Sequence, residues 1–194
     1  MSRTGLDGSA PEPGKRARAP GDLAVVQAFI NTNDREGGKD GLASPEAVKH
    51  WFITRRLMAR GSSVSIEQYR RAIQLREALR QLAIWNTAGQ PESSAFGILD
   101  QEAERSGLMV HFSPGGRLRF GSTTTEFDLA IATILATVAN AFVEGTWHRL
   151  KACARDICQW VFYDRSRNHS AVWCAMSICG SREKARGYYR RHRA

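Results

Sequence analysis

Four cysteines in the last quarter of the chain form two pairs, and this spacing constrains the fold more than any other feature. Cys153 and Cys158 are separated by four residues, and so are Cys174 and Cys179. Two nearby thiolates offer two ligands to one side of a metal ion, and a second pair across a loop completes the tetrahedron that structural zinc prefers. The spacing therefore predicts a small module held together by Zn²⁺.

Disulfides and unligated core thiols are the alternatives for these cysteines. An even cysteine count in a short secreted chain indicates bridges. The N-terminus has basic residues but no apolar segment of the length that a secretory signal needs, and no later stretch is long enough to span a bilayer. We therefore expect a cytoplasmic, reducing compartment, where paired cysteines more often hold metal. His148, His169 and His192 are near enough to substitute as ligands, but four paired cysteines need none.

The region around the cysteines, residues 147–194, is too small to fold on a core of its own. Its apolar residues cluster near the cysteines, and we expect Trp160 and Trp173 to pack against the metal site rather than to stack on nucleic-acid bases. Metal binding then supplies folding free energy directly, on the order of 10 kcal/mol for a structural zinc site. Removal of one cysteine is therefore expected to unfold this module.

Basic residues are concentrated at the C-terminal end of the chain. The formal net charge is +9, and residues 147–194 account for +8 of it, with eleven basic and three acidic side chains. The first twenty residues add +2, so the stretch between them carries −1. Each phosphate that a basic patch neutralises releases condensed counterions, so the patch is typical of nucleic-acid binding. A solvated surface, or one that meets acidic lipids or proteins, is the alternative.

Arginine outnumbers lysine in this patch by nine to two. The planar guanidinium group binds phosphate and guanine edges through two hydrogen bonds at once. The last segment predicts a basic helix, because Ser181 suits an N-cap and Arg182, Arg186, Tyr189 and Arg193 follow at steps of three and four residues. A glycine within it costs roughly 1 kcal/mol relative to alanine. We therefore expect this helix to depend on the zinc module or on DNA for its order.

Residues 149–191 resemble the CGNR-type zinc finger of bacterial proteins. The shared order is a cysteine pair, an aromatic stretch that ends in Tyr-Asp, then Ser-Arg-Asn, Trp-Cys, and finally Cys-Gly followed by a basic tail. The matching positions are Trp160, Phe162, Tyr163, Asp164, Ser166, Arg167, Asn168, Trp173, Cys174, Met176, Cys179, Gly180, Arg182 and Lys184. The chain departs from the family at Ser181, where the motif has asparagine, and at Ala171 and Val172, where members tend to be basic. These departures bear on DNA contact rather than on the metal ligands.

The resemblance implies a zinc finger that binds duplex DNA, joined to the N-terminal, ABATE-like domain of stress-induced transcription regulators. The expected metal ligands are Cys153, Cys158, Cys174 and Cys179. The expected nucleic-acid contacts are basic residues of the module: Arg165, Arg167, Arg182, Lys184, Arg186, Arg190 and Arg191.

The rest of the chain fits this organisation. Residues 1–20 are rich in Gly, Pro, Ala and Arg and predict a disordered leader. A helical, ABATE-like domain then occupies residues 21–146, and the CGNR-like zinc finger occupies residues 147–194. The predicted fold class is mainly α with some β. It comprises a helical domain with one β-hairpin and a small zinc-binding domain that ends in a basic helix.

Caps and apolar spacing predict the helices of the N-terminal domain. The first begins near Asp22, and the second begins at Ser44, with a proline in the first helical position. A third begins at Ser65, with Gln68 as its capping-box partner, and runs to about Asn86. The segments 29–32 and 75–80 also resemble the ABATE-type domain. The arginines of the third helix are expected to form a solvated, salt-bridged face: Arg70, Arg71, Arg76 and Arg80.

The second half of this domain changes pattern. A shorter helix is expected after Pro91, and residues 109–112 and 117–120 then flank a Ser-Pro-Gly-Gly turn, which predicts a β-hairpin. A long apolar helix over residues 125–145 completes the core and leads into the zinc finger.

Enzyme chemistry is not indicated by the sequence. It contains no glycine-rich phosphate loop, no serine nucleophile elbow and no paired histidines at metal-ligand spacing. Asp100, Glu102 and Glu104 do not converge on one helix face, so we expect a solvated acidic patch. A closed four-thiolate zinc site also lacks the open position that catalysis needs.

The function predicted from these features is that of a DNA-binding transcriptional regulator, responsive to a ligand or to stress through its N-terminal domain. A zinc-stabilised module that binds RNA or an acidic protein is the alternative. A small-molecule effector and a homodimer are compatible with this reading, although no effector motif or heptad seam identifies either.

Overall fold

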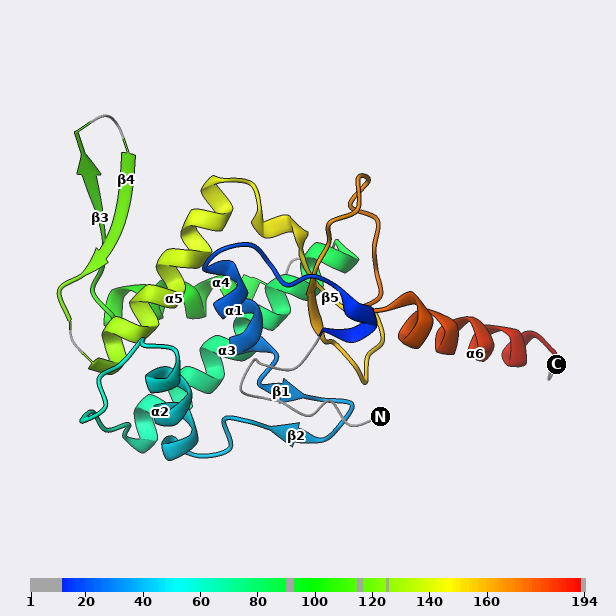
Figure 1. Cartoon of the computed structure of the whole chain (residues 1–194), viewed down its shortest axis with the longest axis horizontal. Coiled ribbons are helices and arrows are strands. Elements are labelled where there is room, and N and C mark those ends of the chain that lie inside the picture. The colour runs from blue at the N-terminus through cyan, green and yellow to red at the C-terminus, as the bar shows by residue number, and fades with distance from the viewer. Residues whose placement is uncertain (1–11, 90–92, 115–116, 125, 193–194) are drawn as a thin grey trace.

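The computed structural model describes residues 12–89, 93–114, 117–124 and 126–192 of the chain, and helices make up most of this part (Figure 1). The α-helices are α1 (Leu23–Ile30), α2 (Pro45–Thr54), α3 (Ile66–Ala88), α4 (Ser93–Arg105), α5 (Glu126–Val143) and α6 (Ser181–His192). Shorter helical turns are η1 (Pro13–Lys15), η2 (Trp147–Arg149) and η3 (Met176–Gly180).

Each strand pairs only with its neighbour along the chain, so the described sheets are three separate antiparallel hairpins. They are β1 (Asn33–Asp34) with β2 (Lys39–Asp40), β3 (Leu108–Ser113) with β4 (Arg117–Ser122), and β5 (Leu150–Ala152) with β6 (Val161–Tyr163). The predicted fold class, mainly α with a hairpin and a basic terminal helix, is confirmed. The small β1–β2 hairpin was not predicted, because its strands have only two residues each and no alternating apolar pattern.

The predicted starts of α2 and α3 are confirmed by their caps. The Ser44 hydroxyl accepts a hydrogen bond from the Ala47 backbone N–H at 3.2 Å, at the start of α2. Ser65 and Gln68 form a reciprocal capping box at the start of α3, with distances of 2.8 and 3.1 Å. Helix α3 ends at Gly89, whose φ of +73° is the left-handed conformation that glycine adopts without strain. Local sequence therefore sets the bounds of the helix that carries much of the core.

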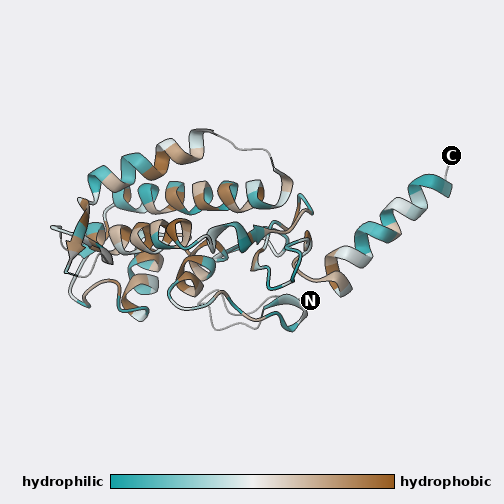
Figure 2. Cartoon of the chain, turned by 90° about the horizontal axis from the view of Figure 1, so that it is seen from above, coloured by the Kyte–Doolittle hydropathy of each residue, from teal (hydrophilic) through white to brown (hydrophobic). Residues whose placement is uncertain are grey.

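The core lies between α1, α2, α3 and α5. It contains an aromatic group in which the ring centroid of Phe52 lies 6.2 Å from that of Phe29 and 5.9 Å from that of Phe127. Leu75, Leu79 and other apolar residues of α3 are fully buried beside it. Figure 2 shows apolar residues on the helices of this domain, whereas the projecting α6 is mostly hydrophilic.

Helix α5 is long and apolar enough to cross a membrane by length and composition, contrary to the expectation that no stretch has the required length. Much of it belongs to the core, because it packs against α1 and α4 and eight of its residues are buried. The same apolar composition serves a core helix.

The β5–β6 hairpin joins the cysteine-containing region to the helical domain. Side chains alternate along a strand, so the two faces of the hairpin contact different cores. Leu150, Val161 and Tyr163 belong to the main core with α3, whereas Trp160 and Phe162 belong to a second cluster around the cysteines. The region after residue 146 therefore shares the core of the helical domain and has a small cluster of its own around the cysteines. That it does not fold without metal stays a prediction.

Residues 12–20, predicted as part of a disordered leader, instead lie across the cysteine-containing region. The Arg16 Nε donates a hydrogen bond to the Cys174 carbonyl at 2.7 Å, and the Trp160 indole N–H donates to the Glu12 carboxylate at 2.9 Å. We call residues 12–20 the N-terminal strap. The sequence did not predict the order of the strap, because the segment has few apolar residues and its contacts are hydrogen bonds to partners more than 140 residues away. The rest of the predicted leader lies outside the described residues.

The solvated, salt-bridged face predicted for the arginines of α3 is confirmed in its ion pairs and at the exposed Arg70, but the prediction is wrong for Arg76 and Arg80. Arg76 and Arg80 are only 2% and 0% exposed. Arg76 forms two hydrogen bonds to Asp40, at 2.6 and 2.8 Å, and Arg80 pairs with Glu77 at 3.0 Å. The spacing along α3 gave no sign of burial, because Asp40 comes from another element.

The prediction of a solvated acidic patch is wrong for Glu102. Glu102 is buried and accepts hydrogen bonds from Arg71 at 2.9 to 3.2 Å, while Asp100 and Glu104 are exposed. Arg71 also pairs with Asp128 of α5 at 2.8 Å. These ion pairs link α3, α4 and α5 inside the helical domain.

Candidate metal centre and nucleic-acid interface

The four cysteines predicted as metal ligands converge at one point. The Sγ atoms of Cys153, Cys158, Cys174 and Cys179 all lie within 4.8 Å of one another, and all four residues are buried. The Sγ atom of Cys174 lies 3.8 Å from that of Cys158 and 3.5 Å from that of Cys179. None of the four forms a disulfide. The structure therefore brings together the set of thiols that the spacing predicted.

A tight turn after β5 places the first pair. The Cys153 N–H donates to the Trp160 carbonyl at 3.0 Å, which continues the β5–β6 ladder beyond its last strand pair. The chain then reverses, with the Cys158 and Gln159 N–H groups both donating to the Arg155 carbonyl, at 2.8 and 3.1 Å. This reversal turns the Cys158 thiol back toward Cys153.

A wide helical turn, η3, places the second pair. The N–H groups of Cys179 and Gly180 both donate to the Ala175 carbonyl, at 3.0 and 3.2 Å. Gly180 gives close approach there, because a Cβ atom at this position would lie 3.1 Å from the Trp173 ring and 2.2 Å from the sulfur of Met176, whose exposed side chain would have to move. The glycine of the Cys-Gly motif therefore lets η3 close against Trp173.

The geometry and chemistry of this donor set fit a tetrahedral zinc ion. Zn–S bonds of about 2.3 Å imply Sγ–Sγ separations of about 3.8 Å around the tetrahedron. Hydrogen bonding with the Cys158 thiol and burial raise the pKa of Cys153 to about 12, and thiol neighbours also raise the pKa of Cys174. The raised pKa values mean that the buried thiols are protonated without a metal, because four neighbouring thiolates would repel one another. A bound divalent metal would stabilise the thiolate form instead.

Arginines that were not predicted as site residues hold the two cysteine pairs in place. Arg16 of the N-terminal strap donates to the carbonyls of Cys174 and Trp173, at 2.7 and 3.0 Å, and its guanidinium lies 4.5 Å from the Phe162 ring centroid. Arg155 lies within 3.8 Å of the Cys179 sulfur. Such outer contacts fix ligand orientation in metal sites. The basic residues themselves were visible in the sequence, but their position beside the cysteines was not.

A buried ion pair shapes the loop between the two cysteine pairs. The Lys151 ammonium lies 3.2 Å from the Asp164 carboxylate and also donates to the His169 carbonyl. The same carboxylate accepts N–H groups of Ser166 and Ala171, at 2.9 and 3.0 Å. Burial opposes the charge, but these hydrogen bonds lower the pKa of Asp164 to about 2. Asp164, which matched the family pattern in the sequence, is therefore a structural anchor of this loop.

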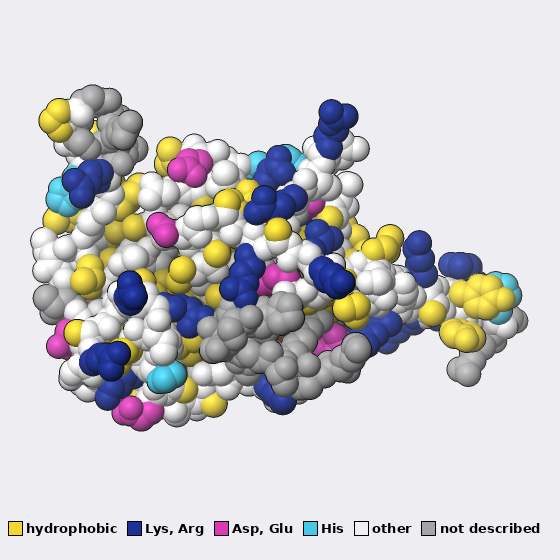
Figure 3. Space-filling model, viewed as in Figure 1, with side chains coloured by type: hydrophobic (Ala, Val, Ile, Leu, Met, Phe, Trp, Pro, Cys, Tyr) yellow, Lys and Arg dark blue, Asp and Glu magenta, His cyan; other side chains and the backbone are white. Residues whose placement is uncertain are grey.

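The basic residues predicted to bind nucleic acid lie on two separate elements. Arg165 and Arg167 are exposed on the loop after β6, and the Arg165 guanidinium donates to the Arg18 carbonyl of the strap at 2.9 Å. The other five lie on α6: Arg182, Lys184, Arg186, Arg190 and Arg191. Figure 1 shows the loop and α6 leaving the metal site in different directions. Figure 3 shows Lys and Arg side chains along α6 and on the neighbouring surface.

Ser181 was predicted to be the N-cap of α6, and this prediction is wrong. Its backbone is already helical, with φ of −65° and ψ of −40°, and its hydroxyl donates to the Met176 carbonyl at 3.1 Å. The wide turn η3 runs directly into α6, so no extended residue is available for a cap at this position. The asparagine of the family motif is replaced here by a residue inside the helix.

The three histidines considered as substitute ligands lie elsewhere. The imidazoles of His148 and His169 contact each other, with 3.1 Å between Nε2 and Nδ1. His192 stacks on Tyr188 near the end of α6, with ring centroids 4.0 Å apart. The metal-binding group found among the described residues consists of the four cysteines alone.

Comparisons with known families match two successive segments of the chain. Residues 149–192 match the family described as "CGNR zinc finger". Residues 23–146, more than half of the chain, match the ABATE family, described as "Putative stress-induced transcription regulator". No curated protein matches the chain. The chain therefore belongs to the ABATE family and carries a CGNR zinc finger after its ABATE domain.

Proposed function

We propose that this protein is a zinc-dependent, DNA-binding transcription regulator. The observation that carries the proposal is α6, a basic helix that projects from the metal site. None of its twelve residues is buried, and five of them are Lys or Arg against one acid. A helix that is polar all round and packs on little of its own protein is unstable alone. An anionic partner would stabilise it, and the family description favours a partner in transcription.

The dimensions of α6 suit duplex DNA. Twelve residues at 1.5 Å rise span about 18 Å, and the major groove admits an α-helix. Arg182 and Arg186 are separated by one turn, and their side chains are 51% and 70% exposed. Five cations spread around the helix can reach phosphates on both sides of a groove.

Zinc has two roles in this proposal. It would hold the four thiolates and thereby fix η3, the turn from which α6 continues without interruption. It would also keep the exposed loop that carries Arg165 and Arg167 attached to the same site. The metal is structural here, because four thiolates leave no open coordination position.

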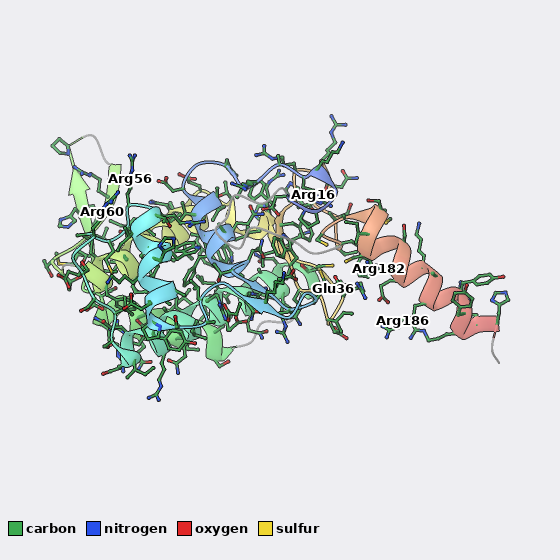
Figure 4. The ribbon with its side chains drawn as sticks, turned by 60° about the horizontal axis from the view of Figure 1, so that its bottom comes forward. Arg16, Glu36, Arg56, Arg60, Arg182 and Arg186 are labelled. Carbon is green, nitrogen blue, oxygen red and sulfur yellow. The ribbon has the colours of Figure 1, made fainter. Side chains whose placement is uncertain are left out.

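The test compares two pairs of arginines that each lie four residues apart. R182A/R186A removes two charges from α6, and R56A/R60A removes the same two charges from the opposite end of the molecule (Figure 4). Duplex binding is measured by fluorescence anisotropy at several salt concentrations.

We expect R182A/R186A to weaken binding by about tenfold or more at low salt. Its slope of log K against log salt should fall by up to about 1.8, since each lost phosphate contact contributes about 0.9. R56A/R60A should bind like the wild type apart from a small uniform loss. Equal losses in the two variants would overturn the assignment of α6 as the DNA-binding element. Tight binding to single-stranded RNA but not to duplex would favour RNA as the partner.

A further inference from the structure

Glu36, at the tip of the β1–β2 hairpin, reaches from the ABATE domain into the basic surface of the zinc finger (Figure 4). Its Oε1 atom accepts hydrogen bonds from Arg155 Nη1 at 2.8 Å and from Arg182 Nη1 at 2.5 Å. One carboxylate oxygen thus lies between two guanidinium groups, one from the turn between the first two cysteines and one from α6.

The two arginines together form an anion-binding site. Guanidinium groups bind carboxylate and phosphate oxygens in the same way, through charge-assisted hydrogen bonds. The Arg155 side chain is 11% exposed and that of Arg182 is 51% exposed, so one wall of the site is fixed and the other faces solvent. An anion from outside the protein would therefore approach along Arg182.

Arg155 has further contacts that do not involve Glu36. It forms an ion pair with Glu183 of α6 at 3.3 Å and lies 3.8 Å from the Cys179 sulfur. These contacts hold its guanidinium in place when the Glu36 carboxylate leaves. The anion site is thus a property of the zinc finger, and Glu36 is its occupant in the free protein.

The hairpin that carries Glu36 is held firmly at its base, whereas its turn is short and has few contacts. Asp40 of β2 is held by two hydrogen bonds from the buried Arg76. The ladder has only two residue pairs, and the turn contains two glycines, of which Gly38 has a φ of +64°. Arg35, also in the turn, donates an exposed hydrogen bond to Gln159 at 2.7 Å. A shift of the tip therefore breaks this bond and the hydrogen bonds of Glu36 to Arg155 and Arg182, and leaves the base in place.

We propose that Arg155 and Arg182 form a binding site for a DNA phosphate, and that Glu36 occupies this site when DNA is absent. The ABATE domain then competes with DNA for the zinc finger. This inference rests on the proposed function and adds a means of regulating it, because any event in the ABATE domain that moves the hairpin tip changes the affinity for DNA.

The first test neutralises the competitor. In E36Q, duplex DNA should bind about three- to tenfold more tightly at low salt, and the slope of log K against log salt should steepen by about 0.9, the contribution of one added phosphate contact. The matched control is E46Q, which removes the same charge from an exposed glutamate paired with Lys49 on α2. Equal affinities of E36Q and E46Q, or weaker binding by E36Q, would overturn the proposal.

Two further variants test whether Glu36 acts by occupying the anion site or only through the long-range effect of its charge. E36D keeps the charge but shortens the side chain by one methylene, so it should also bind DNA more tightly than the wild type. R182A should cancel the gain, so that E36Q/R182A binds DNA no better than R182A. Wild-type affinity in E36D, or a full gain in E36Q/R182A, would mean that the effect is long-range and that Glu36 does not occupy a phosphate site.

A titration with pyrophosphate tests the site without DNA. The arginine Nε–Hε resonances of ¹⁵N-labelled protein are followed in wild type, E36Q and E36Q/R182A. Tighter pyrophosphate binding by E36Q that is lost in E36Q/R182A supports the anion site even if no variant binds DNA, in which case only the proposed function fails. Identical titrations in all three proteins overturn the site even if DNA binding is normal.

Discussion

The guanidinium of Arg80 donates a hydrogen bond to the main-chain carbonyl of Gln159, at 3.0 Å, across the junction between the ABATE domain and the zinc finger. Arg80 lies in the middle of α3, and Gln159 follows Cys158 at the end of the turn that places the first cysteine pair. The same guanidinium donates to the Ile30 carbonyl at 2.6 Å. A single buried side chain therefore ties the core helix, the end of α1 and the metal site together.

Arg80→Ala should destabilise the whole protein. The substitution leaves the Ile30 and Gln159 carbonyls without this donor and removes one of the two arginines that pair with Glu77. A buried acceptor left without a hydrogen bond costs about 1 to 3 kcal/mol, so we expect a loss in this range or somewhat above it. Arg70→Ala, on the same helix but exposed, should cost less than about 0.5 kcal/mol. Urea denaturation of both variants measures the difference. Equal free energies of unfolding for the two variants would refute the role given to Arg80.

Metal removal should unfold the zinc finger locally. The cysteines have their own small cluster, whereas Leu150 and Val161 belong to the core of the ABATE domain. After chelation, amides of residues 153–158 and 174–192 should lose protection against hydrogen exchange, while those of α3, α5 and β6 should keep it. Cys174→Ser should give the same pattern without chelator. Loss of protection throughout the chain, or at none of these amides, would contradict this division.

Arg16→Ala should weaken metal retention. Arg16 holds the carbonyls of Cys174 and Trp173, and loss of such outer contacts typically costs 10- to 100-fold in metal affinity. Competition with a chromophoric chelator measures the affinity. Lys15→Ala, the neighbouring exposed cation, serves as the control and should change it little. If the two variants release metal alike, the strap does not support the site.

Asp164→Asn should destabilise the zinc finger in a pH-dependent way. Its carboxylate balances the buried Lys151 and accepts several hydrogen bonds, so we expect a loss of about 3 kcal/mol at pH 7. The lowered pKa of about 2, against 3.8 ordinarily, means that the carboxylate contributes its full stabilisation above about pH 4 and loses it as the pH falls through 2.

The difference between wild type and Asp164→Asn is followed by thermal unfolding at matched pH, so that acid release of metal affects both proteins. It should be constant from pH 7 to about 5 and then shrink toward pH 2. A difference that grows on acidification would show that Asp164 is not charged in the folded protein.

Short-range patterns in the sequence predicted the parts of this structure that are set locally. The spacing within each cysteine pair predicted that its two thiols lie together, and Ser65 with Gln68 predicted the start of α3, because each depends on neighbours within a few residues. The meeting of the two pairs, 16 residues apart, followed from the preference of zinc for four ligands. Ser181 was the exception, since the wide turn before it changed the backbone that a cap requires.

Contacts between distant segments could not be predicted in this way. Arg76 and Arg80 resemble surface residues by spacing, and their burial is explained by partners on distant elements, such as Asp40 of β2 for Arg76 and the Gln159 carbonyl for Arg80. The strap residue Arg16 lies in a segment with the composition of a disordered leader, yet it hydrogen-bonds a residue 158 positions later. The Glu36 contact with Arg182 has the same origin, because charge patterns do not show which opposite charges meet in the fold.

Metal-dependent DNA binding is tested most directly by an anisotropy titration of mixed-sequence duplex DNA with the wild-type protein, at several salt concentrations, with zinc bound and after chelation. A metal-dependent DNA-binding module should bind at low salt, weaken linearly in log K with log salt, and lose binding when zinc is removed. No binding at low salt with zinc present, or binding unchanged by chelation, would contradict a zinc-dependent DNA-binding function.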